Sequence, residues 1–163
     1  MTLTSTAGYR YVVPVELHAD HIDGQGHLNN AAVARIFNDL RVAHIGAGPG
    51  VRWGEYLRTP GVRRTVVVRE LHIAYDREAT IDDVIVGCVR VSARRGKAKI
   101  VDQCIVDAVR DVPIARAWAV QLFVEDGAVG EFPDFYWDSI AAAEGRIIPA
   151  EPRGPVVSWG PPA

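Results

Sequence analysis

The chain has 163 residues, of which 48% are apolar and 23% charged, and its formal net charge is −2. These values are typical of one globular domain with a hydrophobic core, and the small net charge excludes a general attraction to nucleic acid or to an anionic membrane surface. No apolar run approaches the ~18 residues of a membrane span, the N-terminus lacks the pattern of a signal peptide, and Cys88 and Cys104 are the only cysteines. We therefore expect a cytoplasmic protein with reduced thiols.

The first predicted elements are a strand and a long helix. Residues 9–18 are rich in β-forming side chains, and Pro14 within them favours either an edge position or a bulge. After a turn-rich connection, residues 30–45 predict a helix with Asn29 or Asn30 as its N-cap. One face of this helix is expected to carry Val33, Ile36, Phe37, Leu40 and His44, and the rest of its surface Arg35, Asn38, Asp39 and Arg41.

Strands dominate the rest of the sequence. Residues 50–61 are expected to be irregular, with at most a short helical turn, and a second helix should start near Asp134. Between them the sequence predicts four strands in a meander with antiparallel pairing, over residues 63–75, 83–92, 99–109 and 114–124. An antiparallel sheet packed against one long helix belongs to the α+β class. We predict one domain over residues 1–145 and a proline-rich C-terminal tail over residues 146–163.

The segment DGQGHLNN, residues 23–30, carries the chemistry. It places the carboxylate of Asp23, the imidazole of His27 and two amides directly before a helix start, where backbone N–H groups are free and the dipole is positive. A carboxylate there could act as general base or nucleophile on a carbonyl polarised by those N–H groups. The alternatives are structural: Asp23 hydrogen-bonds its own turn, His27 packs beside it, and Asn29 and Asn30 only cap the helix.

No metal site and no cofactor are expected. His18, His21, His44 and His72 lack ligand spacing with cysteine or aspartate. His18 and His21 do lie near Asp20 and Asp23, a cluster that could bind a metal, but polar residues cluster commonly in loops.

This segment resembles the helix entry of the 4-hydroxybenzoyl-CoA thioesterase-like family of hotdog acyl-CoA thioesterases, where many members read DxDxxGHxNN. The matching residues are Asp23, Gly26, His27, Asn29 and Asn30, and Arg41 fits an arginine that often follows. Residues 71–91 are also similar to the family, and the resemblance spans roughly residues 10–140. His21, Val33 and Asn38 depart from it, since relatives often have an acid, a tyrosine and a glutamate there.

The resemblance implies a hotdog fold, an antiparallel sheet wrapped around one long central helix. It implies that Asp23 is the catalytic carboxylate, with His27 beside it, and that the backbone N–H near Asn30 polarises the thioester carbonyl. Asn29 is then a candidate substrate-binding residue. The family places its active site at a dimer interface, and an exposed sheet edge with a half-lined pocket also favours a homodimer or homotetramer.

Two further groups are candidates for ligand binding. Arg94, Arg95 and Lys97, together with Lys99, cluster at a predicted hairpin turn and suit the phosphates of coenzyme A, although such turns are often simply solvated. Phe37, Trp53 and Tyr56 are either walls of an acyl pocket or ordinary core.

The sequence therefore predicts an acyl-CoA thioesterase that hydrolyses its substrate to a free acid and coenzyme A, without nucleic acid or membrane partners. Two alternatives stay open. One is a non-catalytic hotdog protein that binds acyl-CoA or an acyl-carrier protein. The other is an enoyl-CoA hydratase, whose chemistry would need Asp23 paired with His27 or His21.

Overall fold

The computed structural model describes residues 3–151. Among these, contacts divide the chain into two compact units. The first contains residues 3–45, 73–90 and 102–117, and the second contains residues 46–72, 91–101 and 118–151. Each unit is described by itself below. No helix in the described part of the chain is long and apolar enough to span a membrane.

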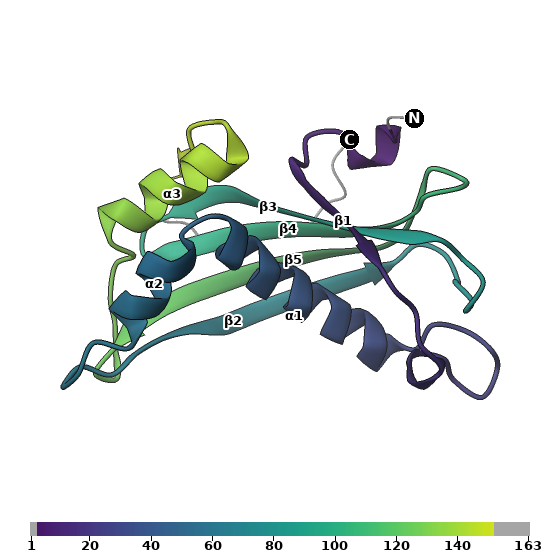
Figure 1. Ribbon diagram of the computed structural model, residues 1–163, viewed down its shortest axis with the longest axis horizontal. Helices are drawn as coiled ribbons and strands as arrows, with labels where there is room; N and C mark the ends of the chain where they lie inside the picture. The colour runs from purple at the N-terminus through teal and green to yellow at the C-terminus, as the bar shows by residue number, and fades with distance from the viewer. Residues whose placement is uncertain (1–2, 152–163) are drawn as a thin grey trace. The chain divides into compact units, whose positions relative to one another are not determined.

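The described residues form three α-helices and seven strands (Figure 1). In chain order these are β1 (Tyr11–Val15), α1 (Asn30–Ala47), α2 (Gly50–Leu57), β2 (Arg64–Tyr75), β3 (Ile85–Arg95), β4 (Ala98–Asp107), β5 (Val112–Glu125), β6 (Ala128–Val129), α3 (Asp134–Glu144) and β7 (Ala150–Glu151). The sheet has the order β1-β3-β4-β5-β2, with β6 paired to β5 and β7 to β3. The α+β class is therefore as predicted.

The sheet order corrects the predicted four-strand meander. Strands β3, β4 and β5 are neighbours in sequence and in the sheet, but β2 pairs with β5 and not with β3. The turns between β3, β4 and β5 are short, which makes each strand pair with the next one. The connection from β2 to β3, residues 76–84, is long enough for these two strands not to be neighbours in the sheet. Sequence adjacency alone was the wrong guide to the partner of β2.

Strand β1 lies at an edge of the sheet, as its proline predicted. It pairs antiparallel with β3, and Pro14 stands opposite Val86. A proline has no N–H to donate, so an edge strand is where a sheet tolerates it.

Helix α1 buries the predicted apolar face against the first unit. Its buried residues are Ala32, Val33, Ile36, Phe37, Leu40, Arg41 and His44. Gly87 of β3 permits this packing, because a Cβ atom there would lie only 2.6 Å from Cδ2 of Leu40. The helix continues through Gly46 to Ala47, slightly beyond its predicted end.

The burial of Arg41 corrects its predicted place on the exposed side of α1. Its side chain is only 6% exposed, and its Nη1 donates to Oε1 of Gln103 at 2.7 Å. Nε2 of Gln103 in turn donates to the carbonyl oxygen of Phe37 at 2.6 Å. A buried polar group needs such partners, and Gln103 lies too far along the chain for periodicity to reveal it.

The second unit has an aromatic core. Residues 50–57, expected to be irregular, form α2, whose Trp53, Tyr56 and Leu57 share the i, i+3, i+4 spacing of a helix face. The ring centroids of Trp53 and Tyr136 are 4.5 Å apart, and Trp53 also meets Phe123, Phe132 and Phe135. Trp53 is therefore a core residue of this unit, and Phe37 is fully buried in the other. The second helix, α3, begins at Asp134 as predicted.

The first residues of the predicted tail are tied to β3. Nη2 of Arg146 donates to the carbonyl oxygen of Val91, and Ala150 and Glu151 pair in parallel with Arg94 and Arg95. Residues 152–163 lie outside the described residues. A domain ending at residue 145 stays a prediction.

Both cysteines are buried and free, as expected. Burial raises the pKa of the Cys88 thiol and of the Cys104 thiol to about 12. The thiolate is the reactive form of cysteine, so neither side chain is suited to nucleophilic chemistry near neutral pH.

The N-terminal segment is held by one carboxylate, which makes its attachment sensitive to acid. Oδ2 of Asp111 accepts hydrogen bonds from the backbone N and the hydroxyl of Thr4, and Oδ1 accepts from the N of Ser5 at 2.9 Å. These bonds lower the pKa of Asp111 to about 2. Because the folded pKa lies below the unfolded value, the stabilisation is complete above about pH 4 and is lost as the pH falls toward 2.

We expect amide hydrogen exchange at Ser5 to accelerate over this range, beyond the intrinsic change, in the wild type but not in Asp111→Ala. Equal pH profiles would contradict the attachment.

Candidate active site

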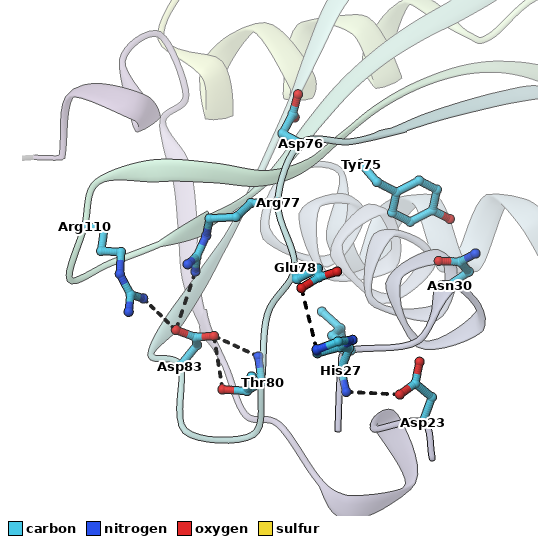
Figure 2. A pocket seen from close by; sticks show the side chains of 11 residues that line it. Asp23, His27, Asn30, Tyr75, Asp76, Arg77, Glu78, Thr80, Asp83 and Arg110 are labelled. Carbon is cyan, nitrogen blue, oxygen red and sulfur yellow. Dashed lines mark hydrogen bonds and ion pairs between the residues drawn. The ribbon is translucent and has the colours of Figure 1, made fainter. Parts of the chain in front are cut away.

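A cavity of about 780 Å³ opens in the first unit where the DGQGHLNN segment meets the loop after β2 (Figure 2). Its lining contains few apolar side chains and many ionisable ones. The lining residues are Asp23, His27, Leu28, Asn30, Tyr75, Asp76, Arg77, Glu78, Thr80, Asp83 and Arg110. Asp23, His27 and Asn30, the three predicted catalytic residues, thus lie in one pocket.

The loop that carries Asp23 is closed by its own backbone. Ile22 and Leu28 form an isolated antiparallel bridge, and the N–H of Asp23 donates to the carbonyl oxygen of His27 at 2.8 Å. Gly26 has a φ of +87°, a conformation that side chains rarely adopt. The glycine-rich composition is therefore what allows so tight a loop to present two ionisable side chains.

The carboxylate of Asp23 is placed both to stabilise its own turn and to act on a ligand in the pocket. Its Oδ1 accepts from the backbone N–H of Gln25 at 2.8 Å and from that of His27 at 3.1 Å, so it does stabilise its own turn. The His27 N–H and then the Gln25 N–H lower the pKa of Asp23. The group is exposed and lines the pocket, so at neutral pH it offers an ionised carboxylate with a fixed orientation.

Asn29 and Asn30 have different roles at the start of α1. Oδ1 of Asn29 accepts from the N–H of Ala32 at 2.7 Å, and its carbonyl oxygen accepts from the N–H of Val33, so Asn29 is the N-cap. Asn29 is not among the residues that line the pocket. Asn30 is the first residue of the helix and does line it. The first N–H groups of a helix lack acceptors within it, which leaves those of Asn30 and Ala31 as donors for a ligand oxygen.

His27 is half-buried and faces a carboxylate that the sequence did not single out. Its Nε2 lies 3.6 Å from Oε2 of Glu78, a residue of the loop after β2 (Figure 2). Next to this pair, the N–H of Leu28 donates to the carbonyl oxygen of Ala79 at 2.7 Å. The two loops of the pocket are thus joined backbone to backbone.

The loop after β2 is fixed by a cluster of four charged side chains. Asp107 is fully buried, and its Oδ2 accepts from Nη2 of Arg77 at 2.7 Å and from Nη1 of Arg110 at 2.6 Å. Arg110 also donates to Oδ1 of Asp83 at 2.8 Å, and Oδ2 of Asp83 accepts from the N–H of Thr80. This cluster holds residues 77–83, and with them Glu78, at the pocket wall.

The basic hairpin lies in the second unit, and its residues are already engaged. Arg94 contacts Glu131 at 3.5 Å, Arg95 pairs with Glu151, and Nζ of Lys97 donates to the carbonyl oxygen of Val129 at 2.9 Å. Arg94 and Arg95 belong to β3, so the turn itself is shorter than predicted. Both arginines pair with acidic residues that are distant in sequence. A run of basic residues in the sequence therefore does not show that their side chains are available to a ligand.

The prediction that Lys99 belongs to the basic cluster at the hairpin is wrong. It is only 1% exposed, and its Nζ donates to the hydroxyl of Tyr136 at 2.5 Å. A buried ammonium held in this way is part of the core of the second unit and cannot meet a ligand at the hairpin surface.

Comparison with known proteins identifies the family. The model of the thioesterase-like superfamily matches residues 17–143. The chain belongs to the thioesterase-like superfamily. Among curated protein sequences, no match was found.

Solved structures confirm the fold of this thioesterase-like chain. A thioesterase from Thermus thermophilus, complexed with coenzyme A and Zn, has a TM-score of 0.73 at 21% identity, covering 86% of this chain and 98% of that one. A hypothetical protein from Staphylococcus aureus in complex with CoA has a TM-score of 0.70 at 15% identity, covering 93% and 89%. A probable thioesterase from Escherichia coli has a TM-score of 0.61 at 19% identity, covering 69% and 81%. The predicted hotdog fold is confirmed.

His18 and His21 of this thioesterase-like chain contact each other outside the pocket that holds His27. Nδ1 of His21 accepts from the backbone N–H of His18 at 3.2 Å, which closes the short helical turn Ala19–His21. Both histidines line a second cavity of about 350 Å³ between β1 and α1. Within residues 3–151, no group of three or more histidine, cysteine or acidic side chains is placed to hold a metal ion.

Sequence reasoning missed most of the pocket, since seven of its eleven lining residues lie outside residues 23–30. Several of the missed residues come from the segment 71–91: Tyr75, Arg77, Glu78 and Asp83. That segment was used only as support for the family resemblance, and none of its side chains was given a role in the site. One signal in the sequence could have indicated these residues. The segment DREATIDD, residues 76–83, follows a long predicted strand and carries more charged side chains than a simple solvated turn usually does.

Proposed function

We propose that the chain is an acyl-CoA thioesterase and that Asp23 is its catalytic carboxylate. The observation that carries this proposal is that Asp23 and the first residue of α1, Asn30, line the same pocket in a chain of the thioesterase-like superfamily. An ionised carboxylate and free helix N–H groups are the two features that attack on a thioester carbonyl needs.

The proposed reaction uses the two oxygens of Asp23 differently. Oδ1 is held by two backbone N–H groups, so Oδ2 is the oxygen available to a water molecule or to the acyl carbon. As general base, it takes a proton from water as the water oxygen bonds to the carbonyl carbon. The carbon–sulfur bond then breaks, the electron pair goes to sulfur, and the proton passes to the thiolate. As nucleophile, Asp23 would bond to the acyl carbon and displace the thiolate, which gives an acyl anhydride. Water then cleaves the anhydride to the free acid and the Asp23 carboxylate, and the proton that it loses passes to the thiolate.

The start of α1 supports the step in which charge builds up. As water adds, the carbonyl oxygen becomes an oxyanion, and the N–H groups of Asn30 and Ala31 at the positive end of the helix stabilise it. A single well-placed donor of this kind contributes about 3–4 kcal/mol in the transition state. Asn30 acts here through its backbone, so substitution of its side chain should matter little.

Coenzyme A is the proposed carrier of the acyl group. Structures of the Thermus thermophilus and Staphylococcus aureus proteins contain it. Arg94, Arg95 and Lys97 remain the proposed phosphate contacts. The Arg94–Glu131 pair is exposed at 36% and 59% of its two side chains, and such surface pairs contribute about 0–1 kcal/mol. A phosphate group could therefore displace Glu131 at little cost.

We propose a homodimer or homotetramer as the active form. Strand β2 is an edge of the sheet, and its exposed apolar side chains include Val67, Val68 and Leu71, at 39%, 42% and 37%. An exposed apolar edge strand invites pairing with another chain unless it is covered. Light scattering should give a mass of twice or four times 17.8 kDa, and a monomer at working concentration would contradict the proposal.

Thiol release is the direct test of the function. We expect the purified protein to release coenzyme A from at least one member of a panel of short, long and aromatic acyl-CoA thioesters, followed with a thiol reagent. Tight binding by calorimetry with no thiol release would instead favour a non-catalytic binding protein. Loss of absorbance from a conjugated enoyl-CoA without thiol release would favour a hydratase.

A further inference from the structure

Glu78 and His27 form the one ion pair between the two loops of the pocket, within the residues that the structure describes. Nε2 of His27 lies 3.6 Å from Oε2 of Glu78, and Figure 2 shows both side chains with Asp23 at the same pocket. The distance exceeds that of a hydrogen bond by less than an ångström. The Glu78 side chain is 79% exposed and can rotate to close it, as catalytic hydrogen bonds often do when a substrate binds.

The backbone on both sides of this pair is fixed. The N–H of His27 donates to Oδ1 of Asp23, and its carbonyl oxygen accepts from the N–H of Asp23. On the other side, the bond from Leu28 to Ala79 and the ion pair of Arg77 with Asp107 flank Glu78. The backbones that carry the pair are therefore anchored, and only rotation of the exposed Glu78 side chain is needed to close it.

The other acids near this loop are committed elsewhere or are not part of the pocket. Both oxygens of Asp76 accept from the guanidinium of Arg116, at 2.8 and 2.6 Å. Asp83 accepts from Thr80 and Arg110. Asp82 is exposed and does not line the pocket. Besides Asp23, Glu78 is thus the carboxylate that faces His27.

We infer that Glu78 is a positioning residue for His27. A carboxylate next to Nε2 favours the tautomer that carries its proton on Nε2, and this leaves Nδ1 as the basic nitrogen. With its tautomer fixed, His27 can orient the attacking water beside Asp23, and this role rests on the proposed thioesterase function. Glu78 acts through His27 and does not itself touch the substrate.

Two measurements on Glu78→Gln test this role, with Asp82→Asn as the matched control that removes one acid from the same loop. The first is the ¹H–¹⁵N spectrum of the histidine rings above neutral pH, in which His27→Gln identifies the His27 signals. We expect the ¹⁵N shifts of His27 to show a larger fraction of the Nε2–H tautomer in the wild type and in Asp82→Asn than in Glu78→Gln. This readout needs no substrate.

The second measurement is the kinetics of thiol release. We expect Glu78→Gln to lower kcat about tenfold with KM changed less than about twofold, and Glu78→Asp to recover part of the loss. A wild-type tautomer in Glu78→Gln, or a kcat within twofold of wild type, would overturn the inference. If Glu78→Gln matches wild type while Asp23→Asn is inactive, the proposed function stands and the role of Glu78 fails. If the wild type hydrolyses no thioester, the proposed function fails, and the ring spectra still decide whether Glu78 sets the tautomer of His27.

Discussion

Replacing Asp23 by asparagine is expected to lower kcat for thioester hydrolysis by about 10²–10⁴-fold while leaving the fold intact. The amide cannot take a proton from water or attack the acyl carbon. Its Oδ1 can still accept from the N–H groups of Gln25 and His27, so the loop keeps its shape. Steady-state thiol release on the best acyl-CoA measures the effect.

The stability of the Asp23→Asn variant distinguishes chemistry from structure. Its urea midpoint should match that of the wild type, because an exposed side chain is changed and its turn-forming acceptor is kept. Asp82→Asn is the control for loss of a negative charge on this side of the molecule and should keep wild-type kcat. Unchanged turnover in Asp23→Asn would remove Asp23 from the mechanism and reduce it to a turn residue.

The sequence could reveal the part of the site that is local. Asp23, His27 and Asn30 lie within one short segment, and the glycines between them together with the helix start dictate how that segment turns. Asn29 could be recognised as a cap candidate for the same reason, although its predicted contact with substrate finds no support in the pocket lining. The shape of this segment is encoded locally, and spacing was sufficient to predict it, whereas the catalytic roles of its residues stay a prediction.

The sequence could not reveal what depends on distant partners. Glu78 meets His27 only because the loop after β2 crosses to the DGQGHLNN segment. Arg41 is buried because Gln103 on β4 accepts its hydrogen bond, and Lys99 is buried because Tyr136 on α3 does the same. A charged side chain read in isolation is assigned to the surface, since burial without a partner would cost several kcal/mol. Strand order failed for β2 for the same reason: its partner β5 is not its neighbour in sequence.

Replacing Asp107 by alanine is expected to lower the free energy of unfolding by about 2–4 kcal/mol. Asp107 is fully buried at the end of β4. Its Oδ1 accepts from the N–H groups of Val109 and Arg110, at 2.8 and 2.9 Å, and its Oδ2 accepts from the guanidinium groups of Arg77 and Arg110. Removing the carboxylate leaves four donors to find water or remain unpaired. Urea unfolding followed by tryptophan fluorescence measures the loss.

Two comparison variants separate the contributions of Asp107. Asp107→Asn keeps an oxygen for the two backbone N–H groups and loses only the charge, so it should retain part of the stability. Arg110→Ala removes a side chain that is 58% exposed and should cost about 1 kcal/mol or less. Equal losses in Arg110→Ala and Asp107→Ala would show that neither the backbone contacts of the carboxylate nor its bond with Arg77 contributes.

The same carboxylate predicts a pH dependence with a definite sign. Burial alone would raise the pKa of Asp107, but the N–H and the guanidinium of Arg110 outweigh it and hold the pKa below its usual value of 3.8. The stabilisation is therefore complete above about pH 4 and is lost as the pH falls below that. The difference in free energy of unfolding between wild type and Asp107→Ala should therefore shrink in acid.

Because Arg77 precedes Glu78 in the loop, loss of Asp107 should also free Glu78 from His27. Asp107→Ala should then shift the His27 ring signals toward those of Glu78→Gln, which connects the stability of the ion cluster to the chemistry of the pocket.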